Sequence, residues 1–344
     1  MKICCFGDTH WSEYSSILRS MGEKYSTRLE NLIKSVNWVF DVALEKKCDM
    51  IIGLGDFFDR ESLNSREITA LNEIDFSKVN VPMYFITGNH EISSGNLFYS
   101  SSTIFNVLGD KYHCIKEPVS IPIENADICF LPYVLENNRK AVSDYFSNTN
   151  RKRIIFSHND IAGVQMGKFK SISGFSIDDI ENNCDLFVNG HLHNGESITR
   201  KIINLGNLTG QNFSEDASKY THKIALIDTD MLNIEYIENP LALNFYKIDL
   251  TDIYSSLNKN NFKSNSVVSI TCLEDNYDEI KRQVNSNKNI IASRISVSRD
   301  FSDISIVDTI SINVSNHLDR FRQYVLENIG SSDDILDELN KVLL

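Results

Sequence analysis

Gly55-Asp56-Phe57-Phe58-Asp59-Arg60 is the stretch that decides the fold of this chain. It follows the apolar run Asp49-Met50-Ile51-Ile52-Gly53-Leu54, whose length and β-branched residues predict a buried strand. Asp56 is therefore expected at the carboxyl end of a strand, where open α/β sheets place their ligand sites. A carboxylate in this place can bridge two cations, although a Gly-Asp pair by itself is more often only a turn.

Other predicted strands end in the same kinds of residue. They are Lys2–Phe6 before Gly7-Asp8-Thr9-His10, Val81–Thr87 before Gly88-Asn89-His90-Glu91, Arg153–Phe156 before Ser157-His158-Asn159, and Asp185–Asn189 before Gly190-His191-Leu192-His193. Five of the eight histidines lie at these strand ends, and we interpret the others, His113, His222 and His317, as surface or structural residues. Histidines that only satisfy hydrogen bonds in a core have no reason to gather in this way.

The first of these strands is joined to the strand before Asp56 by a helix. Ser26 or Thr27 is the expected N-cap, with Glu30 close behind it. Apolar residues then recur at helical spacing and give the helix one buried face: Leu29, Leu32, Ile33, Val36, Phe40, Ala43 and Leu44. The chain therefore opens with a βαβ unit whose two acidic strand ends lie side by side.

The rest of the chain divides near Glu238-Asn239-Pro240, which reads as a boundary. Residues 1–240 form the first predicted domain. Residues 241–312 form a small α/β domain with a strand at 267–271, a helix at 277–284 and a strand at 290–297. Residues 313–344 are expected to be helical, because apolar residues again recur at helical spacing, first from Leu318 to Ile329 and then from Ile335 to Leu343.

The composition limits the class of protein. No apolar run approaches the ~20 residues of a membrane span, and no signal peptide is recognisable, so we expect no membrane association and a cytoplasmic location. The seven cysteines contain no Cys-x-x-Cys pair and are expected to be reduced. The net charge of −13 makes the chain a poor nucleic-acid binder by itself, although a pocket that holds two divalent cations would still attract phosphate.

The side chains at the strand ends form an inventory of metal ligands. Their carboxylate, imidazole and amide groups suit Mn²⁺, Fe or Zn²⁺ better than Ca²⁺. Two cations ~3.5–4 Å apart need one shared carboxylate and about three further ligands each. That inventory is present in Asp8, His10, Asp56, Asn89, His90, His158, His191 and His193.

In their order, these motifs resemble those of the calcineurin-like metallophosphoesterases: Gly-Asp-x-His, Gly-Asp-x-x-Asp, Gly-Asn-His-Glu, Ser-His and Gly-His-x-His, over residues 7–193. The resemblance implies a two-sheet αββα sandwich. It also implies that Asp8, His10 and His193 hold one metal ion, that Asn89, His158 and His191 hold the other, and that Asp56 bridges them. His90 would be the catalytic histidine, oriented by Glu91 or another carboxylate, and a metal-bridging hydroxide would attack the phosphate.

Within this superfamily, the chain resembles the SbcD/Mre-eleven nuclease subunits, including those of phages. The similarity includes Gly55-Asp56-Phe57-Phe58-Asp59, the segment Gly206 to Glu215, the small α/β cap domain and the C-terminal helices. It implies Mn²⁺-dependent exonuclease and single-strand endonuclease activity on DNA, with Mg²⁺, Fe or Zn²⁺ as other possible metals. It further implies DNA repair or recombination as the setting, a homodimer, and a partner ATPase of the SbcC/Rad-fifty type that binds the C-terminal helices.

Other functions remain open at this point. Phosphoprotein phosphatases share Gly-Asn-His-Glu, but Glu61 follows Arg60 here where they have glycine. A small phosphodiesterase is a further alternative, as is a non-catalytic scaffold, although a scaffold would be expected to have lost ligands. The C-terminal helices could also pack simply on their own domain.

Asp59 and Arg60 are the candidate substrate-binding residues. Asp59 stands where many relatives have a histidine that helps to place DNA, which leaves this role of Asp59 in doubt. Further basic residues are candidates for contacts with phosphates, although scattered Lys and Arg more often form a solvated surface: Arg66, Arg151, Lys152, Arg153, Lys168, Lys170, Arg200 and Lys201.

Overall fold

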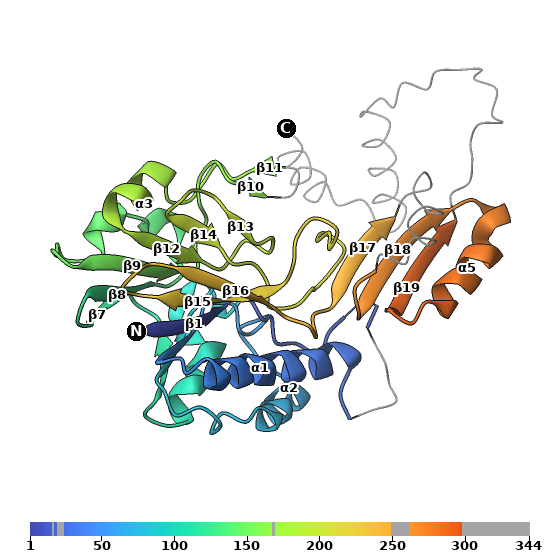
Figure 1. Cartoon of the computed structure of the whole chain (residues 1–344), viewed down its shortest axis with the longest axis horizontal. Helices are drawn as coiled ribbons and strands as arrows, with labels where there is room; N and C mark the ends of the chain where they lie inside the picture. The colour runs from blue at the N-terminus through green and yellow to red at the C-terminus, as the bar shows by residue number, and fades with distance from the viewer. Residues whose placement is uncertain (16, 19–23, 167–168, 249–261, 298–344) are drawn as a thin grey trace, which may run out of the picture. The chain divides into compact units, whose positions relative to one another are not determined.

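The structure is a computed structural model, and it describes residues 1–297 except 16, 19–23, 167–168 and 249–261 (Figure 1). The predicted helical segment 313–344 and His317 therefore lie outside the described residues. Among the helices that are described, none combines the length and the apolar character that a bilayer span needs.

The described part of the chain contains the predicted strands and helices and also further elements that the sequence analysis did not predict. The helices are α1 (Thr27–Glu45), α2 (Ser65–Ala70), α3 (Ile177–Asn183) and α5 (Tyr277–Ser286). The strands are β1 (Lys2–Phe6), β2 (Met50–Gly53), β3 (Met83–Ile86), β4 (Ile92–Ser93), β5 (Asn96–Ser100), β6 (Tyr112–Ile115), β7 (Val119–Pro122), β8 (Ala126–Leu131), β9 (Lys152–Ser157), β10 (Gln165–Met166), β11 (Phe169–Lys170), β12 (Leu186–Asn189), β13 (Glu196–Ser197), β14 (Ile202–Asn204), β15 (Lys223–Asp228), β16 (Ile234–Glu238), β17 (Asn244–Ile248), β18 (Ser266–Cys272) and β19 (Ile290–Val297).

The larger sheets have the strand orders β16-β15-β1-β2-β3-β6 and β13-β14-β12-β9-β8-β7. Strands β1, β2, β3 and β6 are parallel in the first sheet, and β8, β9, β12 and β14 are parallel in the second. Since the carboxyl ends of parallel strands meet at one edge, each sheet gathers its strand-end loops at that edge.

Alternate residues of the central strands pack on opposite sides of each sheet. Ile3 and Cys5 of β1 join Ile128 and Phe156 in the core between the sheets, while Cys4 packs under α1 in another core. On the outer side of the second sheet, α3 covers a third core with Ile180, Ile155 and Phe187 among its members. The fold is therefore the predicted αββα sandwich, with helices outside two facing sheets (Figure 1).

Helix α1 shows how the local sequence sets these layers. The Oγ of Ser26 accepts a hydrogen bond from the backbone N–H of Leu29, so Ser26 is the N-cap. Leu29, Leu32, Val36, Phe40 and Ala43 are buried, as predicted, and Ile33 is partly buried. The prediction was wrong for Leu44, which is 52% exposed. It is in the last turn, where the buried stripe of the helix has rotated away from it.

After β16 the chain forms a smaller sheet with the order β17-β18-β19, in which all strands are parallel. Helix α5 packs on this sheet through Ile280 and Val284. The strand, helix and strand predicted between 267 and 297 are confirmed as elements. The domain boundaries at 240 and 312 stay predictions. All seven cysteines are free, and only Cys114 among them is not buried.

Candidate metal centre

The loops that follow β1, β2, β3, β9 and β12 meet at one place. Three of the residues there, His10, Asp56 and His191, have positive φ angles of 47°, 46° and 64°, which non-glycine residues rarely adopt. Gly55 precedes Asp56 with φ 99°, and a Cβ on it would lie 2.3 Å from Nδ1 of His158. Backbone strain and close approach of this kind are concentrated at functional sites.

The convergent side chains fall into groups whose ligand atoms lie within 4.8 Å of one another. The first group is Asp8, His10 and His193, the second is Asp56, His158 and His191, and a further group joins His10 and Asp56 to His90. Asp56 belongs to the second and the third of these groups, and His10 belongs to the first and the third. The structure thus brings the predicted ligands together, while their role as ligands stays a prediction.

The eighth member of the inventory, Asn89, lies between two of the imidazoles. Its Oδ1 is 3.1 Å from Nε2 of His158 and 3.1 Å from Nδ1 of His191. Asp56 has a similar position, because its Oδ2 is 3.1 Å from Nε2 of His158 and 3.9 Å from Nε2 of His10. The oxygen and nitrogen atoms of these side chains therefore converge, as ligand atoms do around a metal ion.

One nitrogen of each central imidazole is held by a neighbour, which leaves the other nitrogen directed into the cluster. Nδ1 of His10 is 3.1 Å from Oδ1 of Asp59, and Nδ1 of His158 is 2.8 Å from the backbone oxygen of Leu54. His191 is held the other way round, with Nε2 2.9 Å from Oδ1 of Asp160. Such contacts fix ring orientation and tautomer in metal sites.

Two buried polar atoms in the cluster have no hydrogen-bond partner among the described residues. They are Oδ2 of Asp8 and Nε2 of His10, both on side chains that are at most 1% exposed. Buried polar atoms without a partner are rare, because desolvation costs about 1–3 kcal/mol each. A divalent cation in the first group would satisfy both atoms, so the residues fit a metal site.

The charges in the second group point the same way. Burial opposes the imidazolium of His158, but the carboxylates of Asp56 and Asp8 and the backbone oxygen of Leu54 together outweigh burial and raise the pKa of His158 to about 9. Burial likewise opposes the charge of Asp56, yet the positive His158 and His10 lower its pKa below the usual range. A metal ion bound between them would take the place of the imidazole proton.

His90 differs from the other histidines because its side chain is exposed. Its Nδ1 lies 3.1 Å from the backbone oxygen of Asp59, and its ring centroid is 4.7 Å from that of His10. Of the two alternatives expected for the group that orients His90, Glu91 or another carboxylate, Glu91 is wrong. Glu91 is buried and turned away, where its carboxylate accepts hydrogen bonds from the backbone N–H groups of Phe58 and Gly88. Burial raises the pKa of Glu91 to about 8.

The two candidate substrate-binding residues lie in different surroundings. Asp59 contacts His10 and is positioned as a support for that ring rather than as a free group. Arg60 donates to Oγ of Ser12 at 3.1 Å and lies 3.6 Å from Glu67, with its side chain 48% exposed. Binding of substrate by these residues stays a prediction.

Most of the other basic candidates contact protein groups. Arg66 pairs with Glu13 and Arg151 with Asp127, while Arg153 and Lys201 donate to backbone carbonyls. Lys168 lies outside the described residues. Of the histidines interpreted as structural, His113 stacks on Tyr84, and His222 is buried beside the backbone oxygen of Asn207.

Sequence reasoning missed two carboxylates that support the cluster. Asp160 contacts His191, and its position two residues after His158 was the available signal. Glu215 is buried 3.8 Å from Nδ1 of His193, and it accepts a hydrogen bond from the side chain of Asn207. Burial raises the pKa of Glu215 to about 8. The motif over residues 206–215 contains this carboxylate but does not by itself indicate a role for it.

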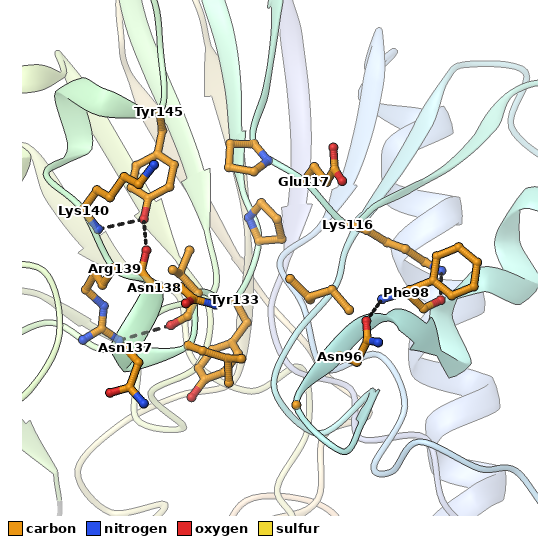
Figure 2. A pocket seen from close by; sticks show the side chains of 16 residues that line it. Asn96, Phe98, Lys116, Glu117, Tyr133, Asn137, Asn138, Arg139, Lys140 and Tyr145 are labelled. Carbon is orange, nitrogen blue, oxygen red and sulfur yellow. Dashed lines mark hydrogen bonds between the residues drawn. The ribbon is translucent and has the colours of Figure 1, made fainter.

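An open groove of about 980 Å³ lies between the segment after β8 on one side and the β4–β5 hairpin with the loop after β6 on the other (Figure 2). Tyr133 lines it, and the ring centroid of Tyr133 is 6.2 Å from that of His191. Arg139, another lining residue, has Nη2 3.8 Å from Oδ2 of Asp160. One part of the groove therefore adjoins the metal centre.

Comparison with known proteins decides the family. Residues 1–195, more than half of the 344, match the model of the family described as calcineurin-like phosphoesterase. The chain is a calcineurin-like phosphoesterase. It is accordingly a hydrolase of phosphoester bonds, and its candidate metal-binding groups agree with the two divalent ions that this family uses.

This calcineurin-like phosphoesterase is similar to the curated protein "Probable exonuclease subunit 1" of Escherichia phage T5. The identity is 26% over 206 residues, which are 58% of this chain and 58% of the relative, so the chain spans well under two thirds of that protein.

Among solved structures, the chain matches an archaeal phosphodiesterase, with 15% identity, a TM-score of 0.36 and coverage of 69% and 99% of the two chains. A dimetal phosphatase from Danio rerio has 13% identity, a TM-score of 0.42 and coverage of 70% and 99%.

Proposed function

We propose that this calcineurin-like phosphoesterase is the nuclease subunit of a DNA repair or recombination complex, and that it hydrolyses DNA phosphodiesters with two divalent cations, preferably Mn²⁺. The observation that carries this proposal is the similarity to the phage T5 protein that is named an exonuclease subunit. The SbcD/Mre-eleven-like motifs at residues 55–59 and 206–215 support it.

The side chains of the cluster have separate tasks in this reaction. Asp8, His10 and His193 would hold one cation, Asn89, His158 and His191 the other, and Asp56 both. When bound, such a pair of cations lowers the pKa of a water and neutralises charge on the phosphate. Asp59, Leu54 and Asp160 hold the imidazoles in the orientation that this needs.

His90 is the residue placed to handle a proton. Its Nδ1 faces the backbone oxygen of Asp59, and its Nε2 has no hydrogen-bond partner among the described residues. An exposed imidazole beside the cluster can protonate the oxygen that leaves when the phosphodiester is cut. We therefore propose the role of general acid for His90.

One experiment separates the candidate activities. Purified protein is incubated with Mn²⁺ or a chelator, and with labelled single-stranded DNA, duplex DNA, a phosphopeptide or bis(p-nitrophenyl) phosphate. We expect metal-dependent cutting of DNA and no dephosphorylation of the peptide. Activity on the phosphopeptide alone would indicate a phosphoprotein phosphatase, and activity on bis(p-nitrophenyl) phosphate alone a small phosphodiesterase. A protein inert on every substrate would be a scaffold.

The partner is proposed to be an SbcC/Rad-fifty-type coiled-coil ATPase that binds residues 313–344, with the nuclease subunit as a homodimer. Removing residues 316–344 should abolish binding of the ATPase in a pull-down and leave hydrolysis of bis(p-nitrophenyl) phosphate intact. If the shortened protein still binds the ATPase, the assignment of the tail is wrong. Sedimentation velocity tests the dimer.

A further inference from the structure

The groove beside the metal centre has two walls with Tyr133 between them (Figure 2). One wall carries Lys140 and Tyr145, whose phenol oxygen accepts a hydrogen bond from the backbone N–H of Lys140 at 2.9 Å. The other carries Phe98 and Lys116. The Nζ of Lys116 donates to the backbone oxygen of Phe98 at 2.8 Å and lies 5.7 Å from the centre of its ring.

We propose that this groove binds an unpaired stretch of the nucleic-acid substrate next to the phosphodiester that is cut, with a base against the ring of Tyr133 and phosphates near Lys116 and Lys140. The proposal rests on the proposed nuclease function and adds the strand form of the substrate. It also names the residues that recognise it.

The position of the groove is the first argument. Tyr133 adjoins His191, and its backbone N–H donates to the oxygen of Thr87, two residues before Asn89. A chain that occupies the groove therefore continues directly into the candidate metal centre. Neighbouring nucleotides of one strand would occupy both places, which is what positioning of a scissile bond requires.

The charge of the lining is the second argument. The protein has 34 Lys and Arg against 47 Asp and Glu, yet the groove is lined by three cations, Lys116, Arg139 and Lys140, and one acid, Glu117. Arg139 is engaged by Glu136 and Asp160. Lys140 is exposed, and its ammonium has no partner among the described residues. A local excess of cations in an acidic protein favours a polyanionic ligand.

The aromatic residues argue for an unpaired strand. Tyr133 is half-buried, so its ring is held in place, and its hydroxyl has no hydrogen-bond partner among the described residues. Phe98 is 73% exposed at the opposite wall. Bases stack on such rings only where they are not already stacked in a duplex. Aromatic faces combined with cations are the usual means of binding single strands without sequence preference.

The test uses the full-length protein with Mn²⁺ and three substrates: a labelled single-stranded oligonucleotide, the same sequence as a blunt duplex, and bis(p-nitrophenyl) phosphate. The variants are Tyr133→Ala, Tyr133→Phe, Lys140→Ala and the double variant Lys116→Ala with Lys140→Ala. Tyr236→Ala on β16 and Lys34→Ala on α1 are the matched controls, because both residues are exposed and remote from the groove lining.

We expect Tyr133→Ala to lower kcat/KM for the single strand by about fivefold or more, because this is the lower end of the effect of losing one stacked base. The decrease in kcat/KM should be smaller for bis(p-nitrophenyl) phosphate. Tyr133→Phe should keep most of the wild-type kcat/KM for the single strand, because its ring is retained. The double lysine variant should reduce the salt dependence of log KM by roughly 0.7 for each lost phosphate contact. The control variants should behave as the wild type.

The outcomes separate the groove from the nuclease. If wild type cuts the single strand and the groove variants cut it equally well at every salt concentration, the groove inference is overturned and the nuclease stands. The groove inference is also overturned if the variants lose activity equally on all three substrates. If wild type hydrolyses bis(p-nitrophenyl) phosphate but no DNA, the proposed nuclease function itself fails.

Discussion

The metal centre and the groove lie next to each other and are built in opposite ways. Asp8, His10, Asp56 and His158 are at most 2% exposed, and each ring is held by a second residue. The groove is open, and Lys140 and Phe98 on its walls are exposed. The contrast indicates that chemistry needs enclosed, fixed groups, whereas recognition of a polymer needs accessible ones.

The largest effect should come from Asp56, the carboxylate proposed to bridge the two cations. Asp56→Ala is expected to lower kcat on the order of 10³-fold, since it removes a ligand of both cations, whose transition-state stabilisation is worth several kcal/mol. The decrease in kcat should be equal for DNA and bis(p-nitrophenyl) phosphate, because Asp56 is in the metal centre and not in the groove. Initial rates measure it, and circular dichroism checks the fold. A rate near wild type would remove Asp56 from the chemistry.

His90 should have the next largest effect. His90→Ala is expected to lower kcat about 10²-fold by removing the proton donor. Metal content, measured by elemental analysis, should stay near that of wild type, because the other ligands remain. The decrease in kcat should be smaller for a substrate whose leaving group needs no proton, such as p-nitrophenolate. If the metal is lost instead, His90 acts as a ligand, as its place in a group with His10 and Asp56 allows.

A smaller effect is expected from Asp160, which holds His191 without belonging to the groups. Asp160→Asn should weaken metal binding about 10- to 100-fold, as is usual when the partner of a liganding imidazole is changed. Titration of the chelated protein with Mn²⁺ measures the affinity. The control is Asp178→Asn, because Asp178 is an exposed carboxylate in the first turn of α3. This variant should leave the affinity for Mn²⁺ unchanged.

The last prediction concerns stability rather than activity, and it tests the enclosed region through the pH dependence of unfolding. Burial lowers the pKa of His222 to about 4, so the folded protein holds this ring neutral while the unfolded chain protonates it below about 6.5. Stability should therefore be complete above pH 6.5 and fall as the pH drops towards 4, by up to about 3 kcal/mol.

The variant His222→Asn tests this. The amide can donate to the oxygen of Asn207 as the imidazole does, but it does not titrate. Urea unfolding of the chelated protein between pH 4 and 7 should show a flatter dependence in the variant. His113→Asn, half-buried at Tyr84, controls for loss of a histidine. An unchanged slope in His222→Asn would assign the pH dependence to other groups.

Much of the centre was predictable because its residues follow strands. The short apolar runs of β1, β2 and β12 locate the strands. Parallel pairing then places Asp8 and Asp56 at one edge of the first sheet and His191 at the corresponding edge of the second. The failures concern residues whose role depends on side-chain direction. Glu91 is next to His90 in sequence, yet it points to the backbone of Phe58 and Gly88.

The sequence by itself thus determined the order of the strand-end motifs and the candidate ligands, because strands and helices follow local patterns of two or 3.6 residues. The family resemblance that these motifs carry implied the αββα layers. Only the tertiary structure decided which nitrogen of each imidazole faces the cluster, which carboxylates support it, and where Phe98, Lys116 and Tyr133 form one groove. These depend on atoms from segments distant in the chain, and no spacing along a sequence encodes the distance between them in space.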